Sequence, residues 1–143
     1  MIVIRPCRVT ECPAVLALWQ RAGAIASPTD TRVELEQLIA HQDDGLLVAV
    51  QDGAIVGSVI GGWDGWRGNI YRLAVAPEAR RRGLARRLVD DAVRVLRARG
   101  ARRISALVER HEAHAVGFWD SLTDVGWHRD ERMMRYIKTV EAG

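Results

Sequence analysis

The sequence has little cysteine and lacks a long apolar run. Its only cysteines, Cys7 and Cys12, do not have C-x-x-C spacing, so we expect packing roles and a reducing compartment. The longest stretch of low charge, Ala54 to Trp63, is about half the length of a membrane span. The apolar start is broken at Arg5 and Pro6, too early for a secretory signal peptide. These absences predict a cytoplasmic protein without a membrane partner.

Lysine is nearly absent, and arginine carries the basic charge. Lys138 is the only lysine, whereas ten arginines lie between Arg80 and Arg103 in a chain of net charge +3. The planar guanidinium suits phosphate recognition, although most of these arginines also fit an ordinary solvated helix face. A nucleic-acid-binding module is the rival interpretation. Because Asp90 and Asp91 interrupt the basic face and no aromatic side chains interleave with it, we expect no nucleic-acid partner.

The apolar periodicity predicts one domain over residues 1–143, in which strands and helices alternate. A chain of this length with 48% apolar content can bury a core without disulfides or metals. The order β-α-α-β-β-β-α-β-α-β predicts an α/β fold with a mixed β-sheet flanked by helices, including a right-handed parallel crossover. The expected strands are Ile2–Arg8, Leu46–Val50, Ala54–Gly61, Asn69–Val75, Arg102–Val108 and Glu131–Lys138. The expected helices are one after an N-cap at Thr10, Thr31–His41, Leu84–Arg99 and Glu112–Leu122.

Residues 69–85, NIYRLAVAPEARRRGLA, form the most informative stretch. A β-type segment is stopped by Pro77 and followed by an arginine-rich loop and a long amphipathic helix. Loop N–H groups and the first turn of a helix direct unpaired donors at one place, where the helix dipole adds partial positive charge. Gly83 lets the backbone approach an anion closely. This order predicts a site for a polyphosphate ligand.

The same stretch resembles a family signature. Arg80-x-x-Gly83-x-Ala85 is similar to the (Arg/Gln)-x-x-Gly-x-(Gly/Ala) motif of the GNAT superfamily of acetyl-CoA-dependent N-acetyltransferases. The resemblance runs from Ile2 to about Lys138 and is greatest to small bacterial single-domain members. It implies an enzyme that moves an acetyl group from acetyl-CoA directly to a primary amine of a small molecule or peptide. A GNAT-like domain that binds acyl-CoA without turnover is the alternative, and a homodimer stays open.

The resemblance also implies the cofactor contacts. In relatives, the strand matching Tyr71–Val75 diverges from the strand matching Ile104–Val108, and the pantetheine arm pairs with the backbone exposed between them. An amide near Val75 is then placed to polarise the thioester carbonyl. The residues implied in cofactor binding are Leu73, Ala74, Val75, Arg80, Arg81, Arg82, Gly83, Leu84, Ala85, Arg86 and Glu112.

A later element departs from the family pattern. Relatives often carry Asn-x-x-Ala-x-x-Phe-Tyr, in which the tyrosine is the acid for the leaving thiolate. Here Glu112 stands in the asparagine position and Trp119 in the tyrosine position. Because indole is not a useful proton donor, the acid is left open between water, Ser121 and no acid at all.

The candidate bases are carboxylates, and Asp64 and Glu109 are the catalytic assignments, ahead of Glu112. Glu109 ends the strand beside the implied cofactor wedge, although an ordinary exposed strand-end carboxylate has the same pattern. Asp64 lies in a turn between two tryptophans, as either a hairpin aspartate or the partner of an ammonium. In the second case the hairpin overhangs the thioester end of the cofactor. Trp63 and Trp66 are then expected to line the acceptor. Tyr71, on the implied cofactor strand, is either a core residue or a further residue that lines the acceptor.

One short cluster has the residue types of a metal site. His111, Glu112 and His114 give the spacing H-E-x-H instead of H-E-x-x-H, and no third ligand is evident. We therefore expect no metal.

Overall fold

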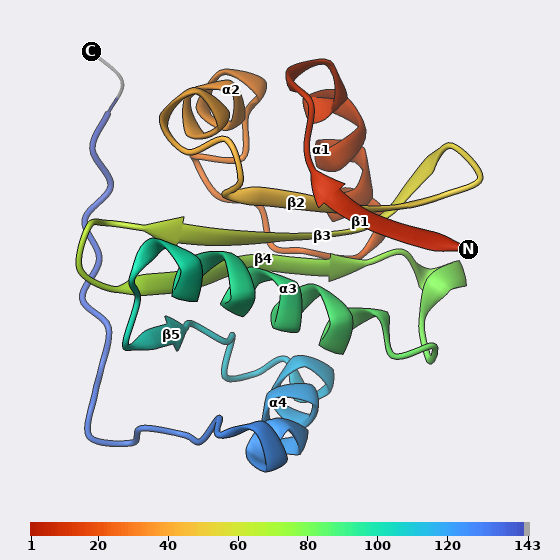
Figure 1. Ribbon diagram of the computed structural model, residues 1–143. Coiled ribbons are helices and arrows are strands. Elements are labelled where there is room, and N and C mark those ends of the chain that lie inside the picture. The colour runs from red at the N-terminus through yellow and green to blue at the C-terminus, as the bar shows by residue number, and fades with distance from the viewer. Residues whose placement is uncertain (142–143) are drawn as a thin grey trace. The chain divides into compact units, whose positions relative to one another are not determined.

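The chain divides into two compact units. The computed structural model describes residues 1–141. The first unit, Met1–Ala106, holds the whole β-sheet, and the second, Leu107–Gly143, holds the remaining helical segments (Figure 1). Within residues 1–141, no helix is both long enough and apolar enough to cross a membrane. The single domain expected from the sequence stays a prediction.

A five-stranded sheet in the order β1-β2-β3-β4-β5 forms the frame of the first unit. Neighbouring strands are antiparallel except β4 and β5, which are parallel and joined through α3. This mixed sheet confirms the predicted α/β class. The strands are β1 (Ile2–Pro6), β2 (Leu46–Gln51), β3 (Ala54–Trp63), β4 (Gly68–Val75) and β5 (Ile104–Ala106). The helices of this unit are α1 (Cys12–Arg21), α2 (Arg32–His41) and α3 (Leu84–Arg99).

Different helices cover the two faces of the sheet. In Figure 1, α1 and α2 lie on one face and α3 lies on the other. The buried side chains of Leu88 and Leu96 pack α3 against the sheet, and burying each leucine contributes about 1.5–3 kcal/mol. Glycines in the strands make room for them. A Cβ on Gly57 would lie 3.0 Å from Leu88 Cδ1, and one on Gly68 would lie 2.8 Å from Leu96 Cδ1.

Most helix and turn signals in the sequence mark real boundaries. Thr31 is the N-cap of α2, and its hydroxyl accepts the N–H of Glu34 at 3.2 Å. Gly100 adopts the left-handed conformation with φ 114° and ends α3. Asp52 and Gly53 form the predicted tight turn between β2 and β3. These local signals worked because each satisfies backbone groups of its own segment.

The predicted N-cap at Thr10 is wrong. Thr10 lies inside a short 3₁₀ turn, Val9–Glu11, and α1 begins only after it. The Glu11 carboxylate fixes this turn because it accepts the backbone N–H of Arg8 at 2.8 Å and both terminal nitrogens of Arg5. The Arg5 contact is the main reason that the pKa of Glu11 falls to about 2.

The second unit contains α4 (Ala113–Asp120) and a 3₁₀ segment (Ser121–Val125), where the sequence predicts one helix. The predicted last strand, Glu131–Lys138, is wrong, because residues 131–138 form no strand. Charged residues fall on both faces of its two-residue period, so neither face is apolar enough to be buried. Met133, Met134 and Tyr136 are accordingly 71%, 76% and 89% exposed. The preceding strand, β5, is also shorter than the predicted Arg102–Val108.

Candidate active site

The loop before α3 has the backbone conformation of an anion-binding turn. A short 3₁₀ turn, Pro77–Ala79, follows β4, and Arg81 and Gly83 then adopt positive φ values of 65° and 73°. Left-handed residues within a turn bring neighbouring N–H groups to one concave side. A Cβ on Gly83 would meet no heavy atom within 4 Å, so the space beside it is open. Gly83 is also the N-cap of α3 and has no side chain to cap the first-turn N–H groups.

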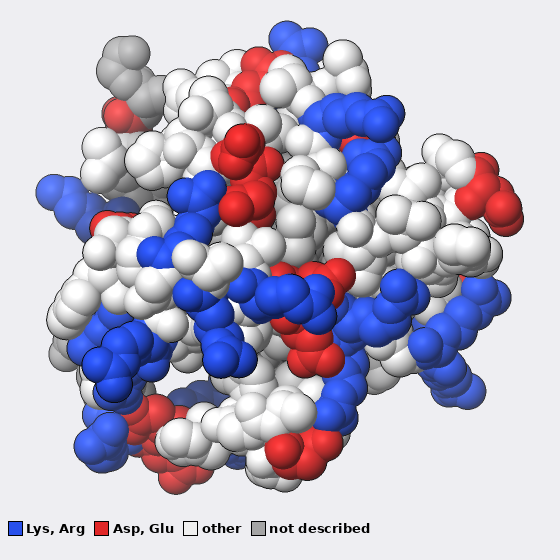
Figure 2. All heavy atoms as spheres, in the orientation of Figure 1, with Lys and Arg blue, Asp and Glu red and all other residues white. Residues whose placement is uncertain are grey.

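The arginines predicted to bind the cofactor lie in this loop and in the first turn of α3. Arg81 and Arg82 are exposed. Arg80 reaches back to the sheet, where its Nε donates to the Val75 carbonyl at 3.4 Å and its Nη2 donates to the Ala22 carbonyl at 3.3 Å. Figure 2 shows acidic side chains among the basic ones over α3. Because α3 begins at Leu84, residues Arg80 to Arg86 lie together at its N-terminal end.

The edge of β4 is only partly paired. Its parallel pairing with β5 ends at Ile70, opposite Ala106, so no strand of residues 1–141 pairs with that edge from Tyr71 onward. The register with β3 also shifts between Ser58 and Ile60, which marks a β-bulge in this part of the sheet. The backbone of the predicted cofactor residues Leu73 to Val75 therefore lies on a strand edge that an extended ligand can pair with.

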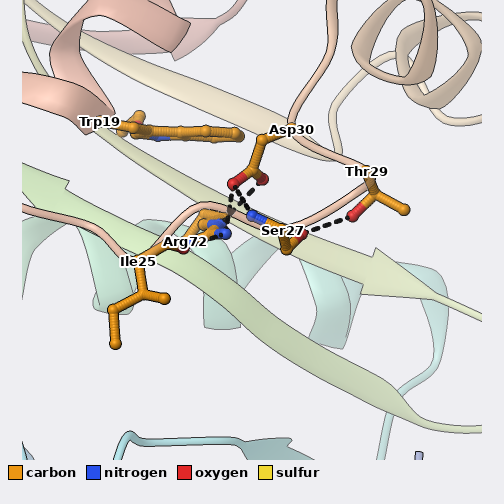
Figure 3. Close-up of polar contacts among 7 residues, drawn as sticks. Trp19, Ile25, Ser27, Thr29, Asp30 and Arg72 are labelled. Atoms are coloured by element: carbon orange, nitrogen blue, oxygen red, sulfur yellow. Dashed lines mark hydrogen bonds and ion pairs between the residues drawn. The ribbon is translucent and has the colours of Figure 1, made fainter. Parts of the chain in front are cut away.

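Arg72 at this bulge is the centre of a polar cluster that the sequence did not reveal (Figure 3). It has a positive φ of 51°. Its Nε donates to Asp30 Oδ1 at 3.1 Å, and its Nη2 donates to Asp30 Oδ2 and to the Ile25 carbonyl, the latter at 2.8 Å. Its guanidinium carbon lies 5.4 Å from the centre of the Trp19 ring. The only sequence signal was an arginine inside an otherwise apolar strand segment.

The hairpin with the predicted acceptor residues lies at the other end of β4. Trp63 faces Gly100, so it packs at the C-terminal end of α3, away from the arginine loop. Trp66 is 71% exposed, and the Arg67 guanidinium lies 4.0 Å from its ring centre. Four residue steps lead from Gly68 to Arg72 at the bulge, which is about 13 Å of strand. This placement disfavours a contact between the hairpin and a thioester held near Val75.

Asp64 is engaged by its own turn. Its Oδ1 accepts the backbone N–H of Trp66 at 2.8 Å and that of Arg67 at 2.7 Å. Hydrogen bonds from Arg67 and then Trp66 hold the pKa of Asp64 below its ordinary value. Tyr71, the other predicted acceptor residue, is 43% exposed, and its ring lies against Gly62 on β3. Of the predicted acceptor residues, only Tyr71 adjoins the unpaired edge of β4.

The second unit holds the other predicted carboxylates. Glu109 and Glu112 are exposed, and the Glu112 N–H donates to the Glu109 carbonyl at 3.1 Å just before α4. Trp119 packs edge-on against Phe118 and Trp127, with ring centres 5.5 Å and 4.9 Å away. Among the described residues, no group of three His, Cys, Asp or Glu side chains is arranged to hold a metal ion.

Ser121, one candidate for the acid, donates its hydroxyl to the Phe118 carbonyl at 2.5 Å. A hydroxyl used in this way ends a helix, since the last carbonyls of a helix lack backbone partners. The hydrogen bond gives Ser121 a local structural role within the second unit.

Comparisons with known proteins place the chain in a family. Residues 12–123 match the model of the acetyltransferase (GNAT) family. An acetyltransferase of Pectobacterium atrosepticum is 37% identical over 119 residues, which are 83% of this chain and 84% of the relative. One from Yersinia enterocolitica is 34% identical over the same shares. Both alignments therefore extend over most of the two chains.

Solved structures share the fold. An aminoglycoside N-acetyltransferase in complex with a bisubstrate analogue of CoA superimposes with a TM-score of 0.74 at 19% identity, over 98% of this chain and 99% of that chain. The ribosomal-protein-S18-alanine N-acetyltransferase from Escherichia coli gives a TM-score of 0.67 at 23% identity, over 85% and 76% of the two chains. The resemblance based on Arg80, Gly83 and Ala85 is thus confirmed. This chain belongs to the GNAT family of acetyltransferases.

Proposed function

We propose that this protein transfers the acetyl group of acetyl-CoA directly to a primary amine of a small molecule or peptide. One observation carries the proposal. Within the first unit, an open loop at the N-terminus of α3 adjoins an edge of β4 that no strand among residues 1–141 pairs with from Tyr71 onward. The loop and helix end suit a diphosphate, and the strand edge suits an extended arm that contains amides. Coenzyme A has both parts.

The residues of the first unit then act by holding the donor in place. The N–H groups of Arg81 to Arg86 and the neighbouring guanidinium groups bind the diphosphate. The main chain of Leu73 and Val75 pairs with the arm, with Ala74 between them. A backbone N–H near Val75 donates to the thioester carbonyl and stabilises the charge that develops there. Bound acetyl-CoA supplies an acetyl group already activated as a thioester.

A carboxylate is proposed to remove the proton from the attacking ammonium, and Asp64 and Glu109 are the candidates. Asp64 is disfavoured as the base because two backbone N–H groups stabilise its charged form. We therefore favour Glu109, acting through water. For the acid we favour water, since Trp119 has no suitable proton. Glu112 is kept as a cofactor-binding residue.

The acceptor is proposed as an amine of a small molecule or peptide, by analogy with two structural neighbours. The names of the structural neighbours include an aminoglycoside N-acetyltransferase and an enzyme that acts on the alanine of a ribosomal protein. Tyr71 is the aromatic side chain next to the unpaired edge and is our first choice for a contact with the acceptor. Trp63 and Trp66 are secondary choices. A cytoplasmic location, a homodimer and the absence of metal, membrane and nucleic-acid partners are further parts of the proposal.

Two measurements on the full chain test the proposal. Acetyl-CoA should raise the melting temperature, since a ligand that binds only the folded state stabilises it. A panel of amines incubated with acetyl-CoA should then release free thiol with at least one member. A melting shift without thiol release from any amine would support the rival acyl-CoA-binding domain. No shift, together with salt-sensitive DNA binding, would support the nucleic-acid-binding module.

A further inference from the structure

Arg72 has a backbone conformation that its side-chain type disfavours. A positive φ is unusual for a residue with a Cβ, and glycine adopts it more readily. The guanidinium makes three hydrogen bonds from this position: Nε and Nη2 donate to the two oxygens of Asp30, and Nη2 also donates to the Ile25 carbonyl. The side chains of Arg72 and Asp30 are only 22% and 15% exposed, so water and salt screen the pair weakly. The side chain therefore supplies a contact that glycine at this position would lack.

Every partner of this guanidinium belongs to the segment between α1 and α2 or to α1 itself. Ile25 and Asp30 lie in the connection 22–31, and Asp30 also accepts the N–H of Ser27 at 2.9 Å, which tightens that connection. The Trp19 ring of α1 faces the guanidinium, and its own N–H donates to the buried Ser58 hydroxyl at 2.8 Å. Arg72 thus ties residues 25–30 of this connection to the bulge of β4, while Arg80 contacts its first residue, Ala22.

We propose that Arg72 and Asp30 are positioning residues that fix the acceptor side of the transfer site. The inference rests on the proposed acetyl transfer. The donor would occupy the N-terminus of α3 and the unpaired edge of β4, and α3 covers one face of the sheet. The connection 22–31 is tied to β4 at the bulge, where that free edge begins. An amine that approaches the thioester from this side meets the connection 22–31, whose position depends on the ion pair.

The test compares two variants of the ion pair with a matched control. Arg72→Gly suits the positive φ and removes only the side chain, whereas Asp30→Asn keeps the shape and removes the charge. Arg94→Ala is the control because it breaks a similar but exposed ion pair, between Arg94 and Asp91 on α3. Each variant is assayed with the best amine from the panel, and hydrogen exchange is measured over residues 22–30.

We expect Arg72→Gly and Asp30→Asn to raise KM for the amine about tenfold or more, as the loss of a charged hydrogen bond implies. KM for acetyl-CoA should stay within about twofold, because no diphosphate contact is lost. Amides 22–30 should exchange faster in both variants, whereas Arg94→Ala should match the wild type. Arg72→Lys should restore part of the loss, since it keeps the charge but not the two-pronged contact.

The outcomes separate this inference from the function on which it rests. If the wild type turns over and both variants keep its KM for the amine, the positioning role is wrong and the transferase function stands. A parallel rise of both KM values would indicate a general structural effect and would also overturn the inference. If none of the amines in the panel causes the wild type to release thiol, the proposed function fails and the inference fails with it.

Discussion

The two ends of β4 have similar residue types, but they differ in whether their polar groups are already hydrogen-bonded within the protein. The hairpin end, residues 63–68, contains an aspartate, an arginine, glycines and two tryptophans. The loop end has arginines and a glycine, and it adjoins an aspartate and a tryptophan through Arg72. At the hairpin end Asp64 is satisfied by two backbone N–H groups and Arg67 lies on Trp66. At the loop end, Gly83 faces open space.

This difference teaches that residue type does not mark a binding site by itself. In the hairpin, Asp64 Oδ1 already accepts two backbone N–H groups of its own turn. The backbone beside the bulge and at the start of α3 has donors and acceptors that secondary structure leaves available. A ligand gains most where the fold has left hydrogen bonds unmade, and this criterion favours the loop end.

The largest expected effect is on acetyl-CoA binding. Gly83→Glu should weaken acetyl-CoA binding by at least about 100-fold, because it puts a bulky negative side chain where the diphosphate is proposed to bind. Gly65→Glu is the matched control, since Gly65 also has a positive φ, 91°, and no heavy atom near its Cβ. Isothermal titration of both variants measures the contrast. Equal acetyl-CoA affinities of the two variants would contradict the assignment of the binding site to the loop end.

The next effect concerns the base. Glu109→Gln should lower kcat about 100-fold and flatten the acidic limb of the pH–rate profile, as expected when a general base is lost. Asp64→Asn should leave kcat within about threefold, because its lowered pKa makes Asp64 a poor proton acceptor. Steady-state rates between pH 5 and 9 decide between them. A flattened acidic limb in Asp64→Asn would show that Asp64 is the base and that the hairpin belongs to the active site.

The hairpin end should respond in stability more than in binding. Gly68→Ala should lower the free energy of unfolding by about 1–3 kcal/mol, because its Cβ would lie 2.8 Å from Leu96 Cδ1. Gly61→Ala is the control, since its Cβ would lie at an ordinary 3.4 Å from Ala92 Cβ. Urea unfolding measures both variants. A weaker acetyl-CoA affinity in Gly68→Ala, without lost stability, would contradict the assignment of this end to packing.

The smallest effect concerns the charge of Asp64. Because its pKa is lower in the folded state, its contribution to stability is present above its unfolded pKa of about 4 and is lost as pH falls through the folded value. Asp64→Asn should therefore narrow the difference in melting temperature between pH 7 and pH 3 slightly. Asp43→Asn is the control, since Asp43 is 89% exposed and its contact with Arg99 is long, at 3.6 Å. An unchanged difference would mean that the turn does not depend on this charge.

The sequence predicted what depends on local order along the chain. The strand, the arginine loop and the glycine before α3 follow one another, so the loop end could be read from residues 69–85. The cluster of Arg72, Asp30 and Trp19 could not be predicted from the sequence. It joins residues up to 53 positions apart (19 to 72) at a bulge, and no residue type indicates that bulge. The prediction of a strand at 131–138 was wrong for a related reason, since a strand forms only where it can pair with the edge of another strand.

The exposed C-terminal segment, residues 131–138 (the tail), also changes what an oxidant can do to this protein. All three methionines are exposed, Met1 at 98% along with Met133 and Met134, so none contributes to the buried core. Methionine sulfoxide is polar and disrupts a core only when the thioether is packed inside it. Mild peroxide should therefore convert all of them while the melting temperature stays constant. A tail that becomes covered would slow the reaction at Met133 and Met134 but not at Met1, which makes these side chains natural reporters of contact.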